Sequence, residues 1–240
     1  MEKKGQERLI LALDVENLEE GRLLLGDLQG ELRYIKIGHQ LYAKGGLPFI
    51  REVMSMGYKV FLDLKMHDIP NTVRMGVEAL ANEGIWALTL HGAGGRAMLE
   101  EACNGRDNVG GKMILLGVTV LTSMNNELWQ EVTPGCSMDH ALRARSTVCA
   151  EAGIDGLVCS PLDLPIINET RGKELIKVVP GIRPSATGDD QARTATPKGA
   201  IIAGADFLVV GRPILKAENR LEALRNILSD IGEGLRWKED

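Results

Sequence analysis

Residues 58–72 read YKVFLDLKMHDIPNT, and the first half of this stretch has the length and apolar character of a β-strand. Alternate side chains of an extended chain point to opposite faces. Val60 and Leu62 therefore share one face, while Phe61, Asp63 and Lys65 share the other. We expect the apolar face to meet helices. That leaves both charges facing the interior of a sheet or barrel at the end of the strand.

A charged turn and the start of a helix follow this strand. Asp68 adds a third charge within six residues of the chain, which is denser than a simple strand-end ion pair requires. Pro70 has a backbone dihedral preset for the first turn of a helix, and we expect Asn71 or Thr72 to cap that helix.

Similar apolar segments recur along the chain. Eight strand candidates lie at 8–14, 33–37, 58–64, 86–91, 113–119, 155–159, 175–179 and 206–210. Amphipathic stretches run between them, among them 18–28, 47–56, 72–83, 141–152 and 221–231. Strand alternating with helix predicts a parallel sheet, and eight strands fit a closed (β/α)8 TIM barrel better than an open doubly wound sheet. With no low-complexity linker in the sequence, we expect residues 1–240 to form a single domain.

The composition is that of a globular enzyme, with 44% hydrophobic and 25% charged residues. A formal net charge of −5 without a basic tract argues against a nucleic acid or an anionic membrane as partner. No apolar run reaches the roughly 18 residues of a membrane span, and MEKKGQE at the N-terminus has no signal core. The cysteines show no CxxC or metal-ligand spacing, so we expect reduced thiols and a cytoplasmic protein; they are Cys103, Cys136, Cys149 and Cys159.

Charged residues gather where the first three strands end, which is where barrel enzymes carry catalytic groups. The first strand ends in Asp14, the second carries Lys36, and the third ends in Asp63 and Lys65. Ionised groups at a barrel mouth need partners, because desolvating an isolated charge is costly. We therefore predict a rigid row of alternating carboxylates and ammonium groups. Spacing alone leaves open the alternative that this row is an ion-pair network that only fixes the barrel rim.

Two segments near the C-terminus point to an anion site. Residues 179–191, VPGIRPSATGDDQ, form a polar loop after the seventh strand whose length suggests a lid. Gly211, after the eighth strand, permits a close backbone approach to a ligand. The loops after the seventh and eighth strands commonly bind phosphate in such barrels. In this chain Arg183 and Arg212 could supply forked donors to a phosphate, and Gln191 an amide donor. The alternative is that both arginines lie on the surface and the loop is merely mobile.

Polar residues also end the fourth and fifth strands. His91 ends the fourth, and the fifth runs into Thr119, Thr122 and Ser123. A histidine at a strand end is as often a hydrogen-bonded structural residue as a catalytic one, so the role of His91 stays open. Aromatic residues make up only 4% of the chain and predict no base-stacking platform.

The stretch FLDLKMHDIPNT at 61–72 closely resembles the active-site strand and loop of the orotidine 5′-phosphate decarboxylase family. Further segments resemble the bacterial pattern of that family in order, and these are LD at 13–14, KIG at 36–38, LTS at 121–123, PGIR at 180–183 with Gln191, and VGRP at 210–213. The resemblance spans nearly the whole chain. Related sugar-phosphate decarboxylases and aldolase-like synthases share D-x-K-x-x-D, whereas the IPNT continuation and the PGIR-to-glutamine loop make the match specific.

The resemblance implies decarboxylation of orotidine 5′-phosphate to UMP in de novo pyrimidine biosynthesis, without metal or cofactor. It implies that Lys65 protonates C6 of the pyrimidine, that Asp63 lies against the substrate carboxylate and that Lys36 completes the charge network. Asp14 would bind the ribose hydroxyls with help from Lys36, and Thr122 would contact the pyrimidine.

The resemblance also implies a phosphate site and a partner subunit. The phosphate would be held by Arg183, Gln191, Gly211 and Arg212. A homodimer is implied in which Asp68 and Thr72 reach into the active site of the partner subunit. The residues by themselves do not predict this dimer.

Two other functions compete with this one. The first is a magnesium-dependent 3-keto-gulonate 6-phosphate decarboxylase or hexulose-phosphate synthase, in which the carboxylates of the same framework would be metal ligands. The second is a catalytically silent phosphate-binding barrel that acts as a regulator. Dependence on a metal separates the first from a cofactor-free enzyme, and turnover separates the second.

Overall fold

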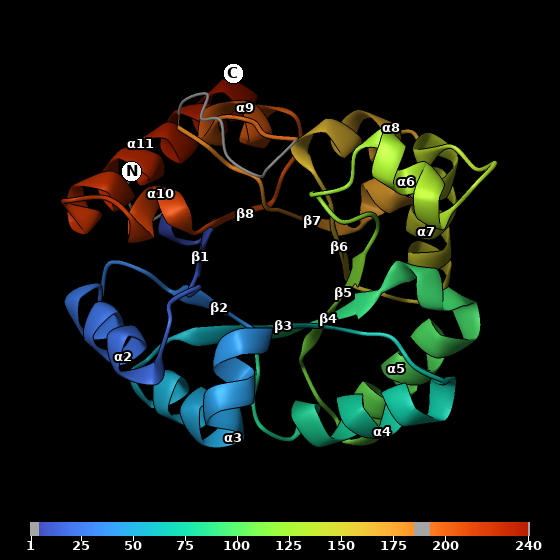
Figure 1. Ribbon diagram of the computed structural model, residues 1–240, viewed down its shortest axis with the longest axis horizontal. Coiled ribbons are helices and arrows are strands. Elements are labelled where there is room, and N and C mark those ends of the chain that lie inside the picture. The colour runs from blue at the N-terminus through green and yellow to red at the C-terminus, as the bar shows by residue number, and fades with distance from the viewer. Residues whose placement is uncertain (1–4, 185–192, 240) are drawn as a thin grey trace.

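A closed barrel of eight parallel strands forms the centre of the molecule. The computed structural model describes residues 5–184 and 193–239. The strands follow one another around the barrel in sequence order, and β8 pairs with β1 to close it (Figure 1). They are β1 Leu9–Ala12, β2 Tyr34–Gly38, β3 Lys59–Met66, β4 Ala87–His91, β5 Ile114–Val118, β6 Gly156–Val158, β7 Ile176–Val179 and β8 Phe207–Val210. The predicted (β/α)8 barrel is therefore confirmed, with strand positions that differ from the expected ones only at their ends.

Helices surround the ring of strands on its outer side (Figure 1). The α-helices are α2 Leu18–Asp27, α3 His39–Ser55, α4 Pro70–Ala81, α5 Gly95–Asn108, α6 Asn126–Val132, α7 Met138–Glu151, α8 Leu164–Asn168, α9 Pro197–Ile202, α10 Arg212–Leu215 and α11 Arg220–Glu239. Short 3-10 turns are η1 Gly92–Gly94, η2 Pro161–Asp163 and η3 Arg171–Glu174. The elements from α2 to α9 connect neighbouring parallel strands, as a parallel sheet requires, and α10 and α11 follow the last strand.

The alternation on β3 separates two apolar layers. Val60 and Leu62 are fully buried and belong to the large cluster between strands and helices. Phe61 is 1% exposed and belongs to a smaller cluster inside the barrel, with Ile10, Leu116 and other inward side chains. The prediction that Phe61 shares its face with Asp63, inside the barrel, is thus confirmed for the middle of the strand.

Aromatic side chains fill the amino-terminal end of the barrel, called the floor below. Tyr34, Trp86 and Phe207 stand at or just before the starts of three strands. Their ring centroids lie 4.4 Å apart for Tyr34–Trp86, 5.5 Å for Tyr34–Phe207 and 5.3 Å for Trp86–Phe207. Packed aromatic rings close this end with apolar surface.

The start of α4 differs from the expectation in one respect. Pro70 is the first residue of the helix, as predicted, but Ile69 occupies the N-cap position and no side chain caps the backbone. Asn71 and Thr72 therefore lie inside the first turn, so the prediction that one of them caps the helix is wrong. The physical reason is that proline needs no N–H partner and fits the first helical position, which moves the helix start ahead of both residues.

Two further properties concern membrane-spanning helices and the cysteines. Within residues 5–184 and 193–239, no helix combines the length and the apolar character that a membrane crossing requires. All four cysteines are free thiols, and three of them are buried.

Candidate active site

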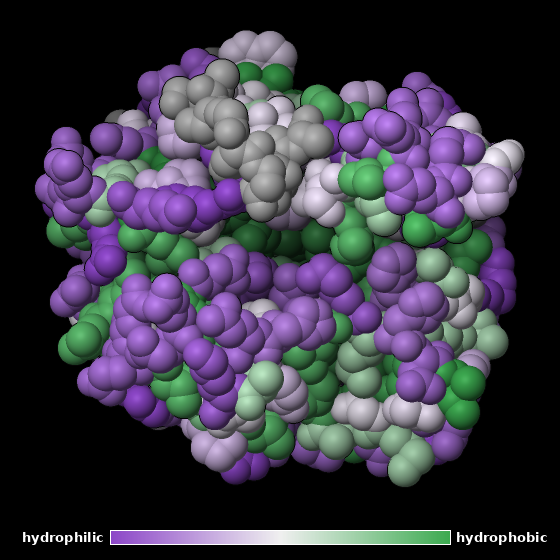
Figure 2. All heavy atoms as spheres, viewed as in Figure 1, coloured by the Kyte–Doolittle hydropathy of each residue, from purple (hydrophilic) through white to green (hydrophobic). Residues whose placement is uncertain are grey.

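A cavity with a volume of about 220 Å³ opens at the carboxyl end of the barrel. Figure 2 shows a hollow near the centre of the molecule, with hydrophilic side chains along its lower edge. The lining side chains come from strand ends and from the loops that follow them, and they are Ala12, Asp14, Lys36, Asp63, Lys65, Val118, Val120, Leu121, Thr122, Val158, Pro180, Gly181, Arg183, Val209, Gly211 and Arg212. Two charged groups of residues face this cavity from different strands.

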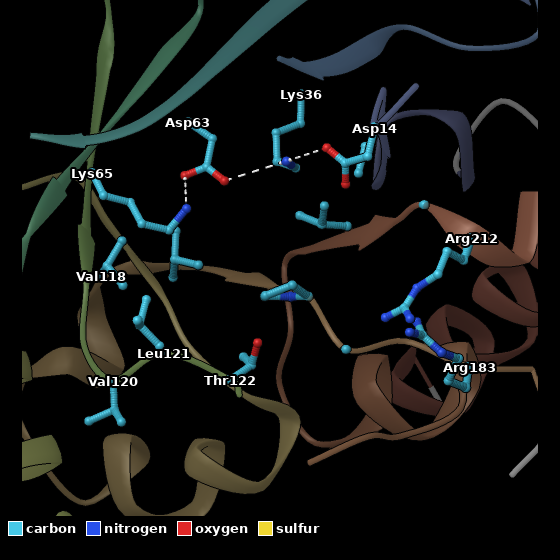
Figure 3. A pocket seen from close by; sticks show the side chains of 16 residues that line it. Asp14, Lys36, Asp63, Lys65, Val118, Val120, Leu121, Thr122, Arg183 and Arg212 are labelled. Carbon is cyan, nitrogen blue, oxygen red and sulfur yellow. Dashed lines mark hydrogen bonds and ion pairs between the residues drawn. The ribbon is translucent and has the colours of Figure 1, made fainter. Parts of the chain in front are cut away.

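The first group is a row formed by Asp14, Lys36, Asp63 and Lys65, called the charged row below (Figure 3). Lys65 Nζ donates to Asp63 Oδ1 at 2.9 Å. Lys36 Nζ lies between two carboxylates, 3.5 Å from Asp63 Oδ2 and 3.3 Å from Asp14 Oδ1. Acidic and basic side chains therefore alternate along the row. Each of the two ammonium groups contacts at least one carboxylate.

Asp63 is the central acid of this row. Burial raises the pKa of its carboxyl, but the ammonium groups of Lys36 and Lys65 and hydrogen bonds from Lys65 and Thr89 outweigh burial and hold that pKa below its ordinary value. Its side chain is 13% exposed. Asp63 is therefore an ionised acid in a nearly dry place, which makes its field on neighbouring groups strong.

The backbone of Lys65 has an unusual conformation. Its φ is 50°, the only positive φ of a non-glycine residue among the described residues. The register between β3 and β4 also shifts between Leu62 and Met66. A left-handed conformation costs a side-chain-bearing residue about 1–2 kcal/mol. Strain of this kind concentrates at functional sites, where it re-aims a side chain.

Thr89, in the middle of β4, is a site residue that the sequence analysis did not single out. It is fully buried, and its hydroxyl donates to Asp63 Oδ1 at 2.9 Å. The hydroxyl oxygen of Thr89 also accepts the backbone N–H of Lys65 at 2.8 Å. Thr89 thus supports both the acid and the strained backbone of the charged row. The available signal was a lone hydroxyl two residues before His91 in an otherwise apolar strand.

The second group lies across the cavity and contains Arg183 and Arg212 (Figure 3). Arg183 is only 7% exposed, which contradicts the alternative of a surface arginine there. Its Nη1 donates to the carbonyl of Ile182 at 2.8 Å. Gly211 also lines the cavity, and a Cβ at its position would stand 3.3 Å from the side chain of Ala12. Gln191 and residues 185–190 of the expected lid lie outside the described residues.

The structure does not bring every predicted residue into the cavity. Thr122 lines it, but Asp68 and Thr72 are exposed and are not among its lining residues. Asp68 Oδ1 instead accepts the backbone N–H of Ile69 at 2.6 Å. Within one chain, therefore, the third charge of the motif stands apart from Asp63 and Lys65.

His91 makes local contacts at the end of β4. Its Nδ1 accepts the backbone N–H of Ala93 at 3.2 Å, and its ring stacks on His67 at 5.2 Å between centroids. Burial, followed by the nearby charges of Arg145, His67 and Lys65, lowers the pKa of His91 to about 4. The imidazole is therefore neutral near pH 7, and it is not a lining residue of the cavity.

Among the described residues, no three His, Cys, Asp or Glu side chains are grouped in a way that could hold a metal ion. Asp63 illustrates why. One of its oxygens accepts from Lys65 and Thr89, and the other faces Lys36. The cavity instead offers cations on both sides, an arrangement suited to an anionic ligand.

Comparison with known proteins identifies relatives along nearly the whole chain. Residues 7–227 match the family described as "Orotidine 5'-phosphate decarboxylase / HUMPS family". The orotidine 5′-phosphate decarboxylase of Opitutus terrae is 43% identical over 224 residues, which is 93% of this chain and 97% of the relative. That of Haemophilus influenzae strain 86-028NP is 42% identical over 228 residues, 94% of this chain and 99% of the relative. The crystal structure of orotidine 5′-phosphate decarboxylase from Lactobacillus acidophilus matches with a TM-score of 0.82 at 35% identity, covering 94% of this chain and 99% of that one.

Proposed function

Because the chain belongs to the orotidine 5′-phosphate decarboxylase / HUMPS family, we propose that it converts orotidine 5′-phosphate into UMP and carbon dioxide without a metal or an organic cofactor. Decarboxylation of this nucleotide in pyrimidine biosynthesis is the activity that relatives at about 40% identity support. The observation that carries the proposal is the charged row facing Arg183 and Arg212 across one cavity. A substrate with a carboxylate at one end and a phosphate at the other fits that arrangement.

In this proposal the two anionic ends of the substrate determine its orientation in the cavity. We assign the phosphate to Arg183, Gly211 and Arg212, whose positions after β7 and β8 form one side of the cavity, with Gln191 as a further donor. On the other side, Asp14 and Lys36 bind the ribose hydroxyls. The pyrimidine then lies beside Thr122 with its carboxylate against Asp63.

The reaction needs a group that stabilises negative charge on carbon and then neutralises it. The bond between C6 and the carboxylate breaks, carbon dioxide leaves, and the electron pair stays on C6. Lys65 Nζ, held 2.9 Å from Asp63, stabilises this charge and then donates its proton to C6. Asp63 and Lys36 keep the ammonium in place, and binding of the distant phosphate contributes to positioning the reacting carbon.

The contacts of Asp63 support a mechanism that needs no metal. A magnesium-dependent enzyme would use such carboxylates as ligands, whereas both oxygens of Asp63 face ammonium groups or a hydroxyl. Activity should therefore persist in excess EDTA. Loss of activity with EDTA and its return with magnesium would instead identify the metal-dependent branch of the family.

Ultraviolet absorbance tests the proposed reaction directly. Purified protein with no added cofactor should deplete orotidine 5′-phosphate and form an equal amount of UMP. The absence of turnover by well-folded protein would contradict the proposal and favour a silent phosphate-binding barrel.

We further propose that the enzyme is a homodimer in which Asp68 and Thr72 complete the site of the partner subunit. Both residues lie outside their own cavity. Large apolar side chains are exposed around them, since Ile69 is 67% exposed and Met75 is 59% exposed. A contact between subunits would bury this surface and bring the two polar side chains to a second cavity.

Subunit mixing tests this shared site. Lys65→Ala and Asp68→Ala chains, each inactive alone, should regain activity when mixed, because a heterodimer has one site with both native residues. The control is a mixture of two differently tagged Lys65→Ala chains, which should stay inactive. If heterodimers form and no activity returns, Asp68 does not serve the neighbouring site.

A further inference from the structure

Arg193 is a nearly buried arginine that the proposed mechanism does not use. It follows β7 in the chain, close to the point where two segments at the cavity edge run side by side. Ile182 forms a parallel bridge with Ala195. The N–H of Arg183 donates to the carbonyl of Ala195 at 2.9 Å. The N–H of Ala195 in turn donates to the carbonyl of Gly181 at 3.3 Å. The backbone around Arg193 is thereby joined to the segment that carries Arg183.

The guanidinium of Arg193 reaches the loops that follow β5 and β6. Its Nη1 pairs with Asp163 and lies 3.5 Å from Met138 Sδ, and its Nη2 donates to the carbonyl of Leu121 at 3.2 Å. Ser160 Oγ donates to the backbone carbonyl of Arg193 at 3.5 Å. One side chain therefore contacts Leu121 and Met138, which lie between β5 and β6, and Asp163 in η2, which follows β6.

Burial makes these contacts hard to replace. The side chain of Arg193 is 12% exposed and that of Asp163 is 2% exposed. Burial raises the pKa of Asp163, and the charge of Arg193 is the largest effect opposing it. Asp163 is in turn fixed by the backbone N–H of Ser160 at 2.9 Å. A planar fork is needed to reach Asp163 and the Leu121 carbonyl at once, which a lysine ammonium cannot do in the same way.

Both regions that Arg193 joins line the cavity. Leu121 and Thr122 form the side assigned to the pyrimidine, while Gly181 and Arg183 belong to the side assigned to the phosphate. We propose that Arg193 is a positioning residue that holds these two sides at a fixed separation, so that a ligand spanning both binds in one geometry. This inference rests on the proposed function, because that function places the two ends of one nucleotide there.

Arg193→Lys tests the role, with Arg106→Lys as a matched control. Arg106 pairs with Asp155 through Nη1 at 2.6 Å and is 14% exposed, but Asp155 precedes β6 and so lies toward the floor of the barrel. We expect Arg193→Lys to lower kcat/KM for orotidine 5′-phosphate by about 10- to 100-fold, since small misplacements cost that much. Arg106→Lys should leave kcat/KM unchanged. Equal losses in both variants, or no loss in either, would overturn the positioning role.

A double-mutant cycle separates positioning from general support of the fold. If Arg193 acts through the Leu121–Thr122 side, Arg193→Lys should have a several-fold smaller effect on kcat/KM once Thr122→Ala has removed the pyrimidine contact. Additive losses would mean that Arg193 does not act through Thr122. If Arg193→Lys does not fold, Asp163→Asn replaces it in the same cycle, because it keeps the size of the side chain and removes the charge of the pair.

Calorimetry with UMP gives a readout that does not depend on turnover. The dissociation constant for UMP should rise about tenfold in Arg193→Lys, because a small misplacement of binding groups has an effect of this size. It should stay unchanged in Arg106→Lys. An unchanged constant in both variants would overturn the inference. Native protein that binds UMP but does not decarboxylate the substrate would contradict the proposed function alone.

Discussion

The two ends of the barrel use the inward face of the same strands in opposite ways. On β3, Lys59 at the floor and Lys65 at the mouth are both lysines at odd-numbered positions of one strand. Lys59 Nζ lies 5.9 Å from the centre of the Tyr34 ring, beside packed aromatic side chains. Lys65 Nζ lies 2.9 Å from a buried carboxylate, on a backbone with positive φ.

This difference shows how one strand separates stability from chemistry. At the floor, apolar rings fill the interior and supply burial, which stabilises the fold. At the mouth, the interior holds ionised groups that must be paired and that leave room for a ligand. Substitutions at the floor should therefore affect unfolding, and substitutions at the mouth should affect turnover.

The largest effect is expected for Lys65→Ala. Removing the proton donor should lower kcat/KM by at least about 1000-fold, because both charge stabilisation and proton transfer are lost. The measurement is the absorbance assay, with circular dichroism to confirm that the barrel is folded. Lys59→Ala is the matched control on the same strand and should keep its activity. A Lys65→Ala enzyme with a tenth of the native rate would rule out Lys65 as the essential acid.

Phe207→Ala should have the reverse effect at the floor. Loss of a partly buried ring that packs on Tyr34 and Trp86 should lower the free energy of unfolding by about 2–4 kcal/mol. Urea denaturation measures this loss, and kcat/KM below the unfolding transition should be unchanged. A large fall in kcat/KM without a loss of stability would mean that the floor and the mouth are not independent.

Thr89→Val sharpens the comparison at the mouth. The change keeps the shape of the side chain but removes the hydroxyl that contacts Asp63 and the Lys65 backbone. We expect kcat/KM to fall by about tenfold, the equivalent of one hydrogen bond to a charged group. Thr119→Val is the control, since Thr119 is equally buried but its hydroxyl donates to the carbonyl of Val158 at 3.2 Å. Similar losses in both variants would contradict a specific role for Thr89.

The smallest effect concerns His91 and pH. Its pKa is lowered to about 4 in the folded protein, below the ordinary 6.5. The unfolded chain therefore binds more protons between these values, so the fold loses stability as pH falls from 6.5 towards 4. Because His91 is only half-buried, we expect solvent screening to limit its share to about 1 kcal/mol.

The measurement is urea denaturation at several pH values. His91→Asn has no imidazole to charge, so its stability should fall less than that of the native protein between pH 6.5 and 4. Parallel curves for the two proteins would show that His91 makes no contribution. Activity at pH 7 should be unaffected if the residue is purely structural.

The sequence predicted the barrel and most of the charged row because both depend on local patterns. Period-two alternation placed Asp63 beside Phe61 on the inward face, and strand ends located Asp14 and Lys36. The N-cap of α4 was predicted wrongly. Pro70 takes the first helical position, so Ile69 and not Asn71 or Thr72 is the N-cap residue. Thr89 was missed because a single hydroxyl in an apolar strand has no local pattern.

The sequence by itself determined which residues alternate, where strands end and which charges stand at those ends. Only the tertiary structure decided that Thr89 contacts Asp63 and that Lys65 takes a positive φ, and both lie where the register between β3 and β4 shifts. It also decided that one guanidinium, at Arg193, joins loops far apart in the chain. Local periodicity dictates the direction of a side chain, but its partners are set by strand register and loop packing, which are properties of the closed barrel.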